Sequence, residues 1–224
     1  MAASIDLAAA RRLLGADLLG PEEIRAAFDF VPPTPPIPYA ESELAAAAPG
    51  GEMLLLRVDH DRSTPLSLSR LIERFPAAFD SRLLRNSGYL LKDEWGIALE
   101  PLAGSEHCSA GWVLVRKQVL DETRNLPYDE QDQQIARYAA DLGLPAALIC
   151  RRSAVEIAYD LIVYHSARGV RLLGQAWDWS TSRTLDNGYL NVGSFGENGM
   201  QILSYSPPVH HGALGVCPVR LPAR

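Results

Sequence analysis

The chain has 224 residues, of which 47% are hydrophobic and 21% are charged, and its net charge is −6. These proportions are ordinary for a globular protein, and the acidic balance argues against nucleic-acid binding, since affinity for phosphates depends on clustered cations. No apolar run approaches the roughly 20 residues of a membrane span, and the N-terminal stretch lacks the apolar centre of a signal peptide. We therefore expect no membrane insertion and synthesis in the cytoplasm, while association with a virion or display on a surface stays open.

The basic residues and the cysteines add two compositional hints. Lys92 and Lys117 are the only lysines, and this arginine bias, with the many alanines, indicates a GC-rich genome and hints at a hot habitat and a thermostable protein. Cys108, Cys150 and Cys217 are widely separated and form no C-x-x-C pair. Reduced structural thiols are therefore favoured over a disulfide framework or a zinc site.

The first 50 residues are predicted to form a helical arm with a proline-rich connector. Helices are expected at 5–14, 21–29 and 42–48, and five prolines between Pro32 and Pro38 predict a stiff extended segment. Pro21 and the acidic residues that follow it suit the first turn of a helix. A docking motif for a proline-binding module is the alternative interpretation of the connector.

The middle of the chain predicts strands alternating with helices. A strand is expected at 51–59, followed by a helix with Thr64 as N-cap, Pro65 in its first turn, and an apolar stripe of Leu68, Leu71, Ile72 and Phe75. A second strand is expected at 111–119 and a polar-faced helix at 127–143, closed by Gly143.

The next helix has the clearest start signal. Ser153 and Glu156 form a capping box, which predicts a helix from Ala154 to about Gly169. Its expected buried face consists of Val155, Ala158, Leu161, Ile162 and His165, with the histidine as a core or boundary residue rather than a metal ligand.

After Gly169 the apolar periodicity changes to two, which is typical of strands. Strands are expected at 171–182, 189–195, 200–206 and 213–220, with turns at 186–188 and 196–199. Trp177 and Trp179 should share one face, with Asp178 opposite. Helices followed by an antiparallel meander predict an α+β fold.

The sequence contains no signature of a known catalytic site. G-x-S-x-G, H-E-x-x-H, P-loop and G-x-G-x-x-G motifs are absent. Adjacent His210 and His211 should point to opposite sides of an extended segment, and His60, flanked by acids, has no second ligand cluster. The paired acids of "KDEW" at 92–95 are typical of a solvated turn. We expect neither a metal site nor a cofactor.

Three short motifs lie near the end of the chain: Gly193-Ser194-Phe195, Ser204-Tyr205-Ser206, and Leu214-Gly215-Val216 leading to Arg220. With the "WDWSTS" strand and the capped helix, they resemble the C-type-lectin-like fold. The likeness is nearest to the branch shared by formylglycine-generating enzymes and the variable proteins of diversity-generating retroelements. It covers roughly residues 127–220. Phe195 stands where that branch commonly has tryptophan, and the last strand contains Cys-Pro.

The resemblance implies helices packed on a small antiparallel sheet, with residues 51–224 as the domain and a variable ligand-binding region at about 177–217. The variable-protein branch implies a non-enzymatic, phage- or prophage-encoded binder of a protein or glycan on a cell surface. The oxidase branch implies a copper-dependent enzyme with two active-site cysteines, and here Cys217 has no sequence-near partner. A structural virion or scaffold protein is a third hypothesis, favoured by the proline-rich arm.

Tyrosine, tryptophan, serine, asparagine and histidine suit adaptable recognition, because aromatics give contact area with few rotatable bonds and the small polar groups hydrogen-bond flexibly. The predicted ligand-binding residues are Trp177, Trp179, Tyr189, Asn191, Ser194, Asn198, Ser204, Tyr205, Ser206, Val209, His210 and His211. Their expected inward-facing partners are Val192, Phe195, Ile202, Leu214 and Val216. An ordinary solvated meander is the alternative for these polar positions.

Overall fold

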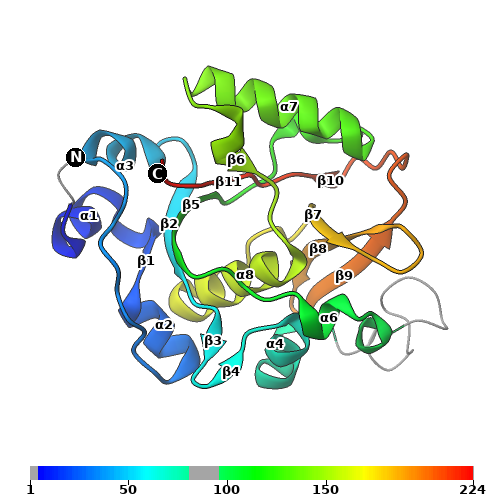
Figure 1. Cartoon of the computed structure of the whole chain (residues 1–224), viewed down its shortest axis with the longest axis horizontal. Coiled ribbons are helices and arrows are strands. Elements are labelled where there is room, and N and C mark those ends of the chain that lie inside the picture. The colour runs from blue at the N-terminus through cyan, green and yellow to red at the C-terminus, as the bar shows by residue number, and fades with distance from the viewer. Residues whose placement is uncertain (1–4, 81–95, 224) are drawn as a thin grey trace.

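A computed structural model describes residues 5–80 and 96–223 of the chain (Figure 1). Its helices are α1 (Leu7–Leu14), α2 (Pro21–Phe28), α3 (Glu41–Ala47), α4 (Leu68–Arg74), α6 (Leu102–Ser105), α7 (Tyr128–Asp141) and α8 (Ala154–Arg168). Its strands are β1 (Leu18–Leu19), β2 (Glu52–Arg57), β3 (His60–Asp61), β4 (Thr64–Pro65), β5 (Gly111–Arg116), β6 (Ile149–Cys150), β7 (Trp177–Arg183), β8 (Tyr189–Gly196), β9 (Gly199–Tyr205), β10 (Leu214–Gly215) and β11 (Val219–Arg220). The predicted α+β class is confirmed.

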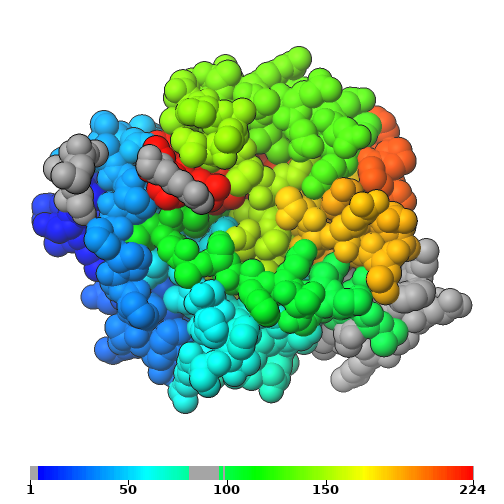
Figure 2. Space-filling view, in the orientation of Figure 1, coloured from blue at the N-terminus to red at the C-terminus, as the bar shows by residue number. Residues whose placement is uncertain are grey.

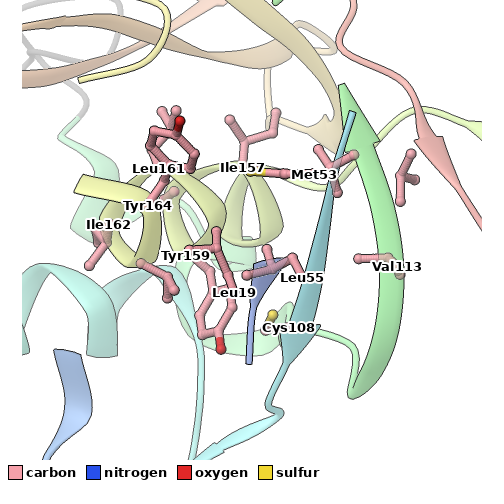
Figure 3. Close-up of a cluster of buried hydrophobic side chains, with 14 of the residues drawn as sticks. Leu19, Met53, Leu55, Cys108, Val113, Ile157, Tyr159, Leu161, Ile162 and Tyr164 are labelled. Carbon is pink, nitrogen blue, oxygen red and sulfur yellow. The ribbon is translucent and has the colours of Figure 1, made fainter. Parts of the chain in front are cut away.

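Helix α8 lies at the centre of the molecule and contacts both larger sheets as well as α2 and α4 (Figure 1). The capping box is present, and Gly169 ends the helix in the left-handed conformation with a φ of 68°. Burial extends beyond the predicted stripe, however, and takes in Ile157, Tyr159 and Tyr164 (Figure 3). A helix enclosed from several sides has to be apolar nearly all round. His165 lies at its edge, with its ring 5.2 Å from that of Phe195.

The five-stranded sheet has the order β1-β2-β5-β11-β6. Strands β2 and β5 pair antiparallel, with Leu54 opposite Leu114, and every residue of β2 is buried. Continuous apolar runs such as "MLLL" suit a strand that is covered on both faces. Leu55 and Met53 of β2 pack towards α8, as Figure 3 shows.

The four-stranded sheet has the order β10-β7-β8-β9, and it carries the candidate site. Strands β7, β8 and β9 form the predicted antiparallel meander, whereas β10 runs parallel to β7. The single last strand predicted at 213–220 is wrong, because the chain leaves one sheet after Gly215 and enters the other at Val219. Between them, the Cys217 amide donates to the Asp178 carboxylate and Pro218 has no N–H to donate.

Two elements also begin well after their predicted start. Thr64 and Pro65 pair with β3, and the following helix begins at Leu68, where the Ser67 hydroxyl accepts from the Arg70 amide. The strand predicted from residue 171 begins only at Trp177, because 172–175 form turns. In both cases the apolar pattern extends into the turn-forming segment before the element, so the pattern predicts a start that is too early.

The first 50 residues share the core of the rest of the chain. Strand β1 pairs with β2, and Ile24 and Phe28 of α2 belong to the main buried cluster. The proline-rich segment is held by the Trp112 indole, which donates to the Pro35 carbonyl at 2.8 Å. The division into an arm at 1–50 and a domain at 51–224 stays a prediction. Among the described residues, no helix is both long enough and apolar enough to cross a membrane.

A buried ion-pair chain ties α8 to both sheets. Asp160 accepts from Arg57 of β2 and from Arg152, and Arg152 also donates to Asp178 of β7 at 2.7 Å. All four side chains are at most 2% exposed. Burial alone would lower the pKa of Arg57, but the attraction of Asp160 and of Glu156 outweighs it and raises that pKa. The network fixes β7 against the helix and so stiffens the strand beneath the site.

Candidate ligand-binding surface

One face of the β7–β8–β9 meander gathers the aromatic residues. Trp177 lies opposite Gly193, Trp179 lies opposite Asn191, and Tyr189 lies opposite Tyr205. Because strand side chains alternate, this register places all these residues on one face. Trp177 and Trp179 share that face and Asp178 points to the other, as predicted. The Asp178 side is buried against α8.

Five aromatic side chains meet on this face, and we call them the aromatic platform: Tyr128, Trp177, Tyr189, Tyr205 and His211. Tyr128 stacks on Tyr189 with ring centroids 4.1 Å apart and an interplanar angle of 11°. His211 stacks on Tyr205 and meets Trp177 edge-on. All except Tyr128 are half-buried, so their rings are supported by neighbours and still reach solvent. Figure 2 shows the segment around β7, in yellow to orange, at the surface below α7.

Tyr128 is the residue that sequence reasoning missed. It is the first residue of α7, 8% exposed, and its hydroxyl donates to the Ser180 carbonyl at 3.1 Å. Burial raises its pKa to about 12. The Arg151 guanidinium lies 3.9 Å from the ring centroid and donates to the carbonyl of the same residue. Only an aromatic residue directly after Pro127 could have drawn attention to it, and that is a weak signal.

The loop at 206–213 is anchored and covers part of the platform. The Tyr128 amide donates to the Pro207 carbonyl, and the Asn125 amide donates to the His211 carbonyl. His210 contacts the Asn125 carbonyl through Nδ1 at 2.8 Å. These bonds tie the loop to the start of α7.

Two polar groups on this face have no hydrogen-bond partner among the described residues. The amide of Asn191 is fully buried, and both its oxygen and its nitrogen are unpaired. The indole nitrogen of Trp177 is likewise buried and unpaired. Buried polar atoms are nearly always bonded, so these two groups have hydrogen-bonding capacity that the described residues leave unused.

The remaining predicted residues fall into three groups. Trp179 is 0% exposed and Ser204 is 9% exposed, so they lie beneath the surface, and Ser204 belongs to the opposite face. Asn198 lies in the turn between β8 and β9, whereas Ser194 is half-buried beside Gly193, and its amide donates to the Ala176 carbonyl. Ser206 and Val209 belong to the anchored loop and are exposed and half-buried, respectively. The expected inward-facing partners Val192, Phe195, Ile202, Leu214 and Val216 are all buried.

Replacing Asn191 with leucine is expected to raise the free energy of unfolding by about 1–2 kcal/mol, because the same branched skeleton then buries no unpaired amide. Chemical denaturation monitored by circular dichroism measures the change. Asn198→Leu, at an exposed turn position, is the matched control and should leave stability nearly unchanged. A loss of stability in Asn191→Leu would show that the amide is satisfied in solution.

A smaller cavity adjoins the platform. Its volume is about 320 Å³, and Tyr128, Asp132, Arg151 and Thr181 are among the residues that line it. It lies between α7, the β6 segment and Thr181 of β7.

The other candidates for chemistry do not assemble into a site. Within residues 5–80 and 96–223, no group of three or more His, Cys, Asp or Glu side chains is placed to hold a metal ion. His60 pairs with Asp59 at 2.9 Å, and the acids at 92–95 lie outside the described residues. The three cysteines are free, and burial raises the pKa of each thiol.

Comparison of the chain with known proteins assigns it to no family. No protein-family model, no curated protein and no solved structure matches the chain.

Proposed function

We propose that this protein is a non-enzymatic ligand-binding protein with a C-type-lectin-like fold. Its contact surface is the aromatic platform together with the loop at 206–213. The ligand is a protein or a glycan on a cell surface. The observation that carries this proposal is the convergence of five ring side chains on one supported, solvent-facing sheet surface.

The composition and the support of this surface fit recognition better than catalysis. Tyrosine, tryptophan and histidine offer large contact areas at low conformational entropy, and aromatic residues dominate binding hot spots. The Trp177 indole nitrogen, unpaired on a half-buried side chain, can give a ligand a directional hydrogen bond. An oxidase of the related branch would need a reactive thiolate, and the raised pKa of the Cys217 thiol disfavours one.

We further infer that the surface belongs to a retroelement variable protein. Outward side chains on β7, β8 and β9 can change while the buried partners Val192, Ile202 and Leu214 preserve the scaffold. The coding DNA tests this idea. We expect a near-copy of the 3′ end nearby, differing almost only at adenines, beside a reverse transcriptase gene. Lack of such a repeat removes the variable-protein assignment and leaves the binding proposal standing.

Alanine substitution of Tyr205 and of His211 is expected to weaken binding about 30-fold or more each, as is typical of aromatic hot-spot residues. Binding is measured on a glycan array and by flow cytometry on a panel of bacterial cells. Tyr138→Ala, on α7 away from the meander, is the matched control and should bind as the parent does. Failure of the parent to bind in both formats, or equal loss in the control, contradicts the proposal.

A further inference from the structure

A second, larger cavity is lined by residues between Phe30 and Gly111, all of which precede the platform residues in the sequence. Its volume is about 700 Å³, and it is formed where the paired ends of β2 and β5 meet the proline-rich segment. We call it the proline pocket, and it is lined by Phe30, Pro33, Thr34, Pro35, Leu56, Arg57, Val58, Asp59, His60, Arg62, Ala110 and Gly111. This volume lies within the range of about 300–1,000 Å³ that is typical of small-molecule sites.

The walls of the proline pocket are mostly apolar and are held in place. Pro33 and Pro35 have no N–H to donate, and the Pro35 carbonyl is already bonded to the Trp112 indole. Figure 1 shows this segment passing between α2 and α3 along the edge of the molecule that carries β1. A pre-formed wall with few donors favours an apolar ligand body.

One cation at the rim of the pocket has no ion-pair partner within residues 5–80 and 96–223. The Asp59 carboxylate contacts the His60 ring nitrogen at 2.9 Å, and the Arg57 guanidinium forms ion pairs with Asp160 and Glu156. Arg62 is exposed and, within residues 5–80 and 96–223, has neither an ion pair nor a side-chain hydrogen bond. An anionic group is the complement of an unpaired guanidinium, which binds carboxylates with two parallel donors.

The backbone at Arg62 supports the same conclusion. Its φ is 60°, in the turn between β3 and β4, where glycine or asparagine would be relaxed. A long, charged side chain at a strained turn position is a reason to look for a function of that side chain. Arg62 is also among the residues that line the cavity, so position and charge agree.

We propose that the proline pocket binds a small amphipathic molecule with an alkyl or aryl body and a single carboxylate. The body lies against Val58, Pro33 and Ala110, and the carboxylate pairs with Arg62. No covalent step is involved. This site is separate from the aromatic platform, and its existence does not depend on the function proposed there.

Decanoate, titrated below its micellar range and followed by isothermal calorimetry, tests the proposal on the full chain. We expect saturable binding at one site, with 1-decanol and decylamine binding at least about ten-fold more weakly, since a charge-assisted hydrogen bond is lost. Binding that is absent, or equal for the three head groups, overturns the proposal.

Three variants locate the site. Arg62→Gly removes the cation and relieves the positive φ, so it should fold normally and lose at least about ten-fold in decanoate affinity. Ala110→Phe fills an exposed part of the lining and should abolish binding, whereas Arg12→Ala removes an exposed arginine of α1 and should have no effect. Unchanged decanoate affinity in Arg62→Gly or in Ala110→Phe places the ligand elsewhere and ends the proposal.

Tyr205→Ala should bind decanoate as the parent does, which separates this result from the test of the platform.

Discussion

Replacing Asp160 with asparagine is expected to lower the free energy of unfolding by about 3–5 kcal/mol, the range for breaking a buried ion pair by removing one partner. Asp160 is 0% exposed and accepts two hydrogen bonds from Arg57 and one from Arg152. The neutral amide supplies one acceptor oxygen and turns two N–H donors towards guanidinium groups that are themselves donors. Glu156 still pairs with Arg57 at 2.8 Å, which limits the loss but leaves Arg152 with less compensation.

Urea denaturation followed by circular dichroism measures this effect. The matched control is Asp121→Asn, which removes an exposed partner of Arg124 and should change stability by less than about 1 kcal/mol. Equal effects of the two variants would mean that the Arg57–Asp160–Arg152 chain is hydrated in solution. A selective loss in Asp160→Asn would confirm that it is a buried structural element.

Replacing Gly193 with alanine is expected to lower the free energy of unfolding by about 3 kcal/mol, at the upper end of the range for overpacking. A Cβ at this position would lie 2.1 Å from the Ala176 carbonyl oxygen and 2.6 Å from the Trp177 Cα. These are backbone atoms of the neighbouring strand, so no side-chain rotation relieves the contact. Strands β7 and β8 have to separate, and Trp177 moves away from the platform.

Thermal unfolding measures the loss of stability, and near-ultraviolet circular dichroism reports the displacement of Trp177. Gly196→Ala in the same strand is the control, because the nearest atom to its Cβ would be 3.9 Å away. We expect that variant to stay within about 0.5 kcal/mol of the parent. A well-folded Gly193→Ala protein with parental tryptophan signals would contradict the close β7–β8 approach.

The elements that sequence reasoning located correctly are those with strong local signals. The α8 helix begins after Ser153 and ends at Gly169 because the cap side chains and the left-handed glycine act within one turn. The Gly-rich turn between β8 and β9 was found for the same reason. Turn chemistry involves neighbours in the chain, so it is visible without the fold.

The errors arose where a hydrogen-bonding partner outside the predicted element decides the structure. Thr64 has the chemistry of a helix cap, yet pairing with Asp61 draws it into a strand. The sequence at 213–220 is typical of one continuous strand. In the fold, however, the Cys217 amide donates to Asp178, and the chain then enters a second sheet. Propensity is a weak prior that such tertiary contacts override.

For the candidate site, alternation predicted that Trp177 and Trp179 share one face, because strand side chains repeat every two residues. The pairing register of the folded sheet adds Tyr189 and Tyr205 to that face. Only the folded chain shows which of these residues reach solvent. It also brings Tyr128 onto Tyr189 from a different segment and leaves the Asn191 amide buried and unpaired. Burial and contact between remote segments depend on how the layers pack, and no pattern within a single strand encodes that.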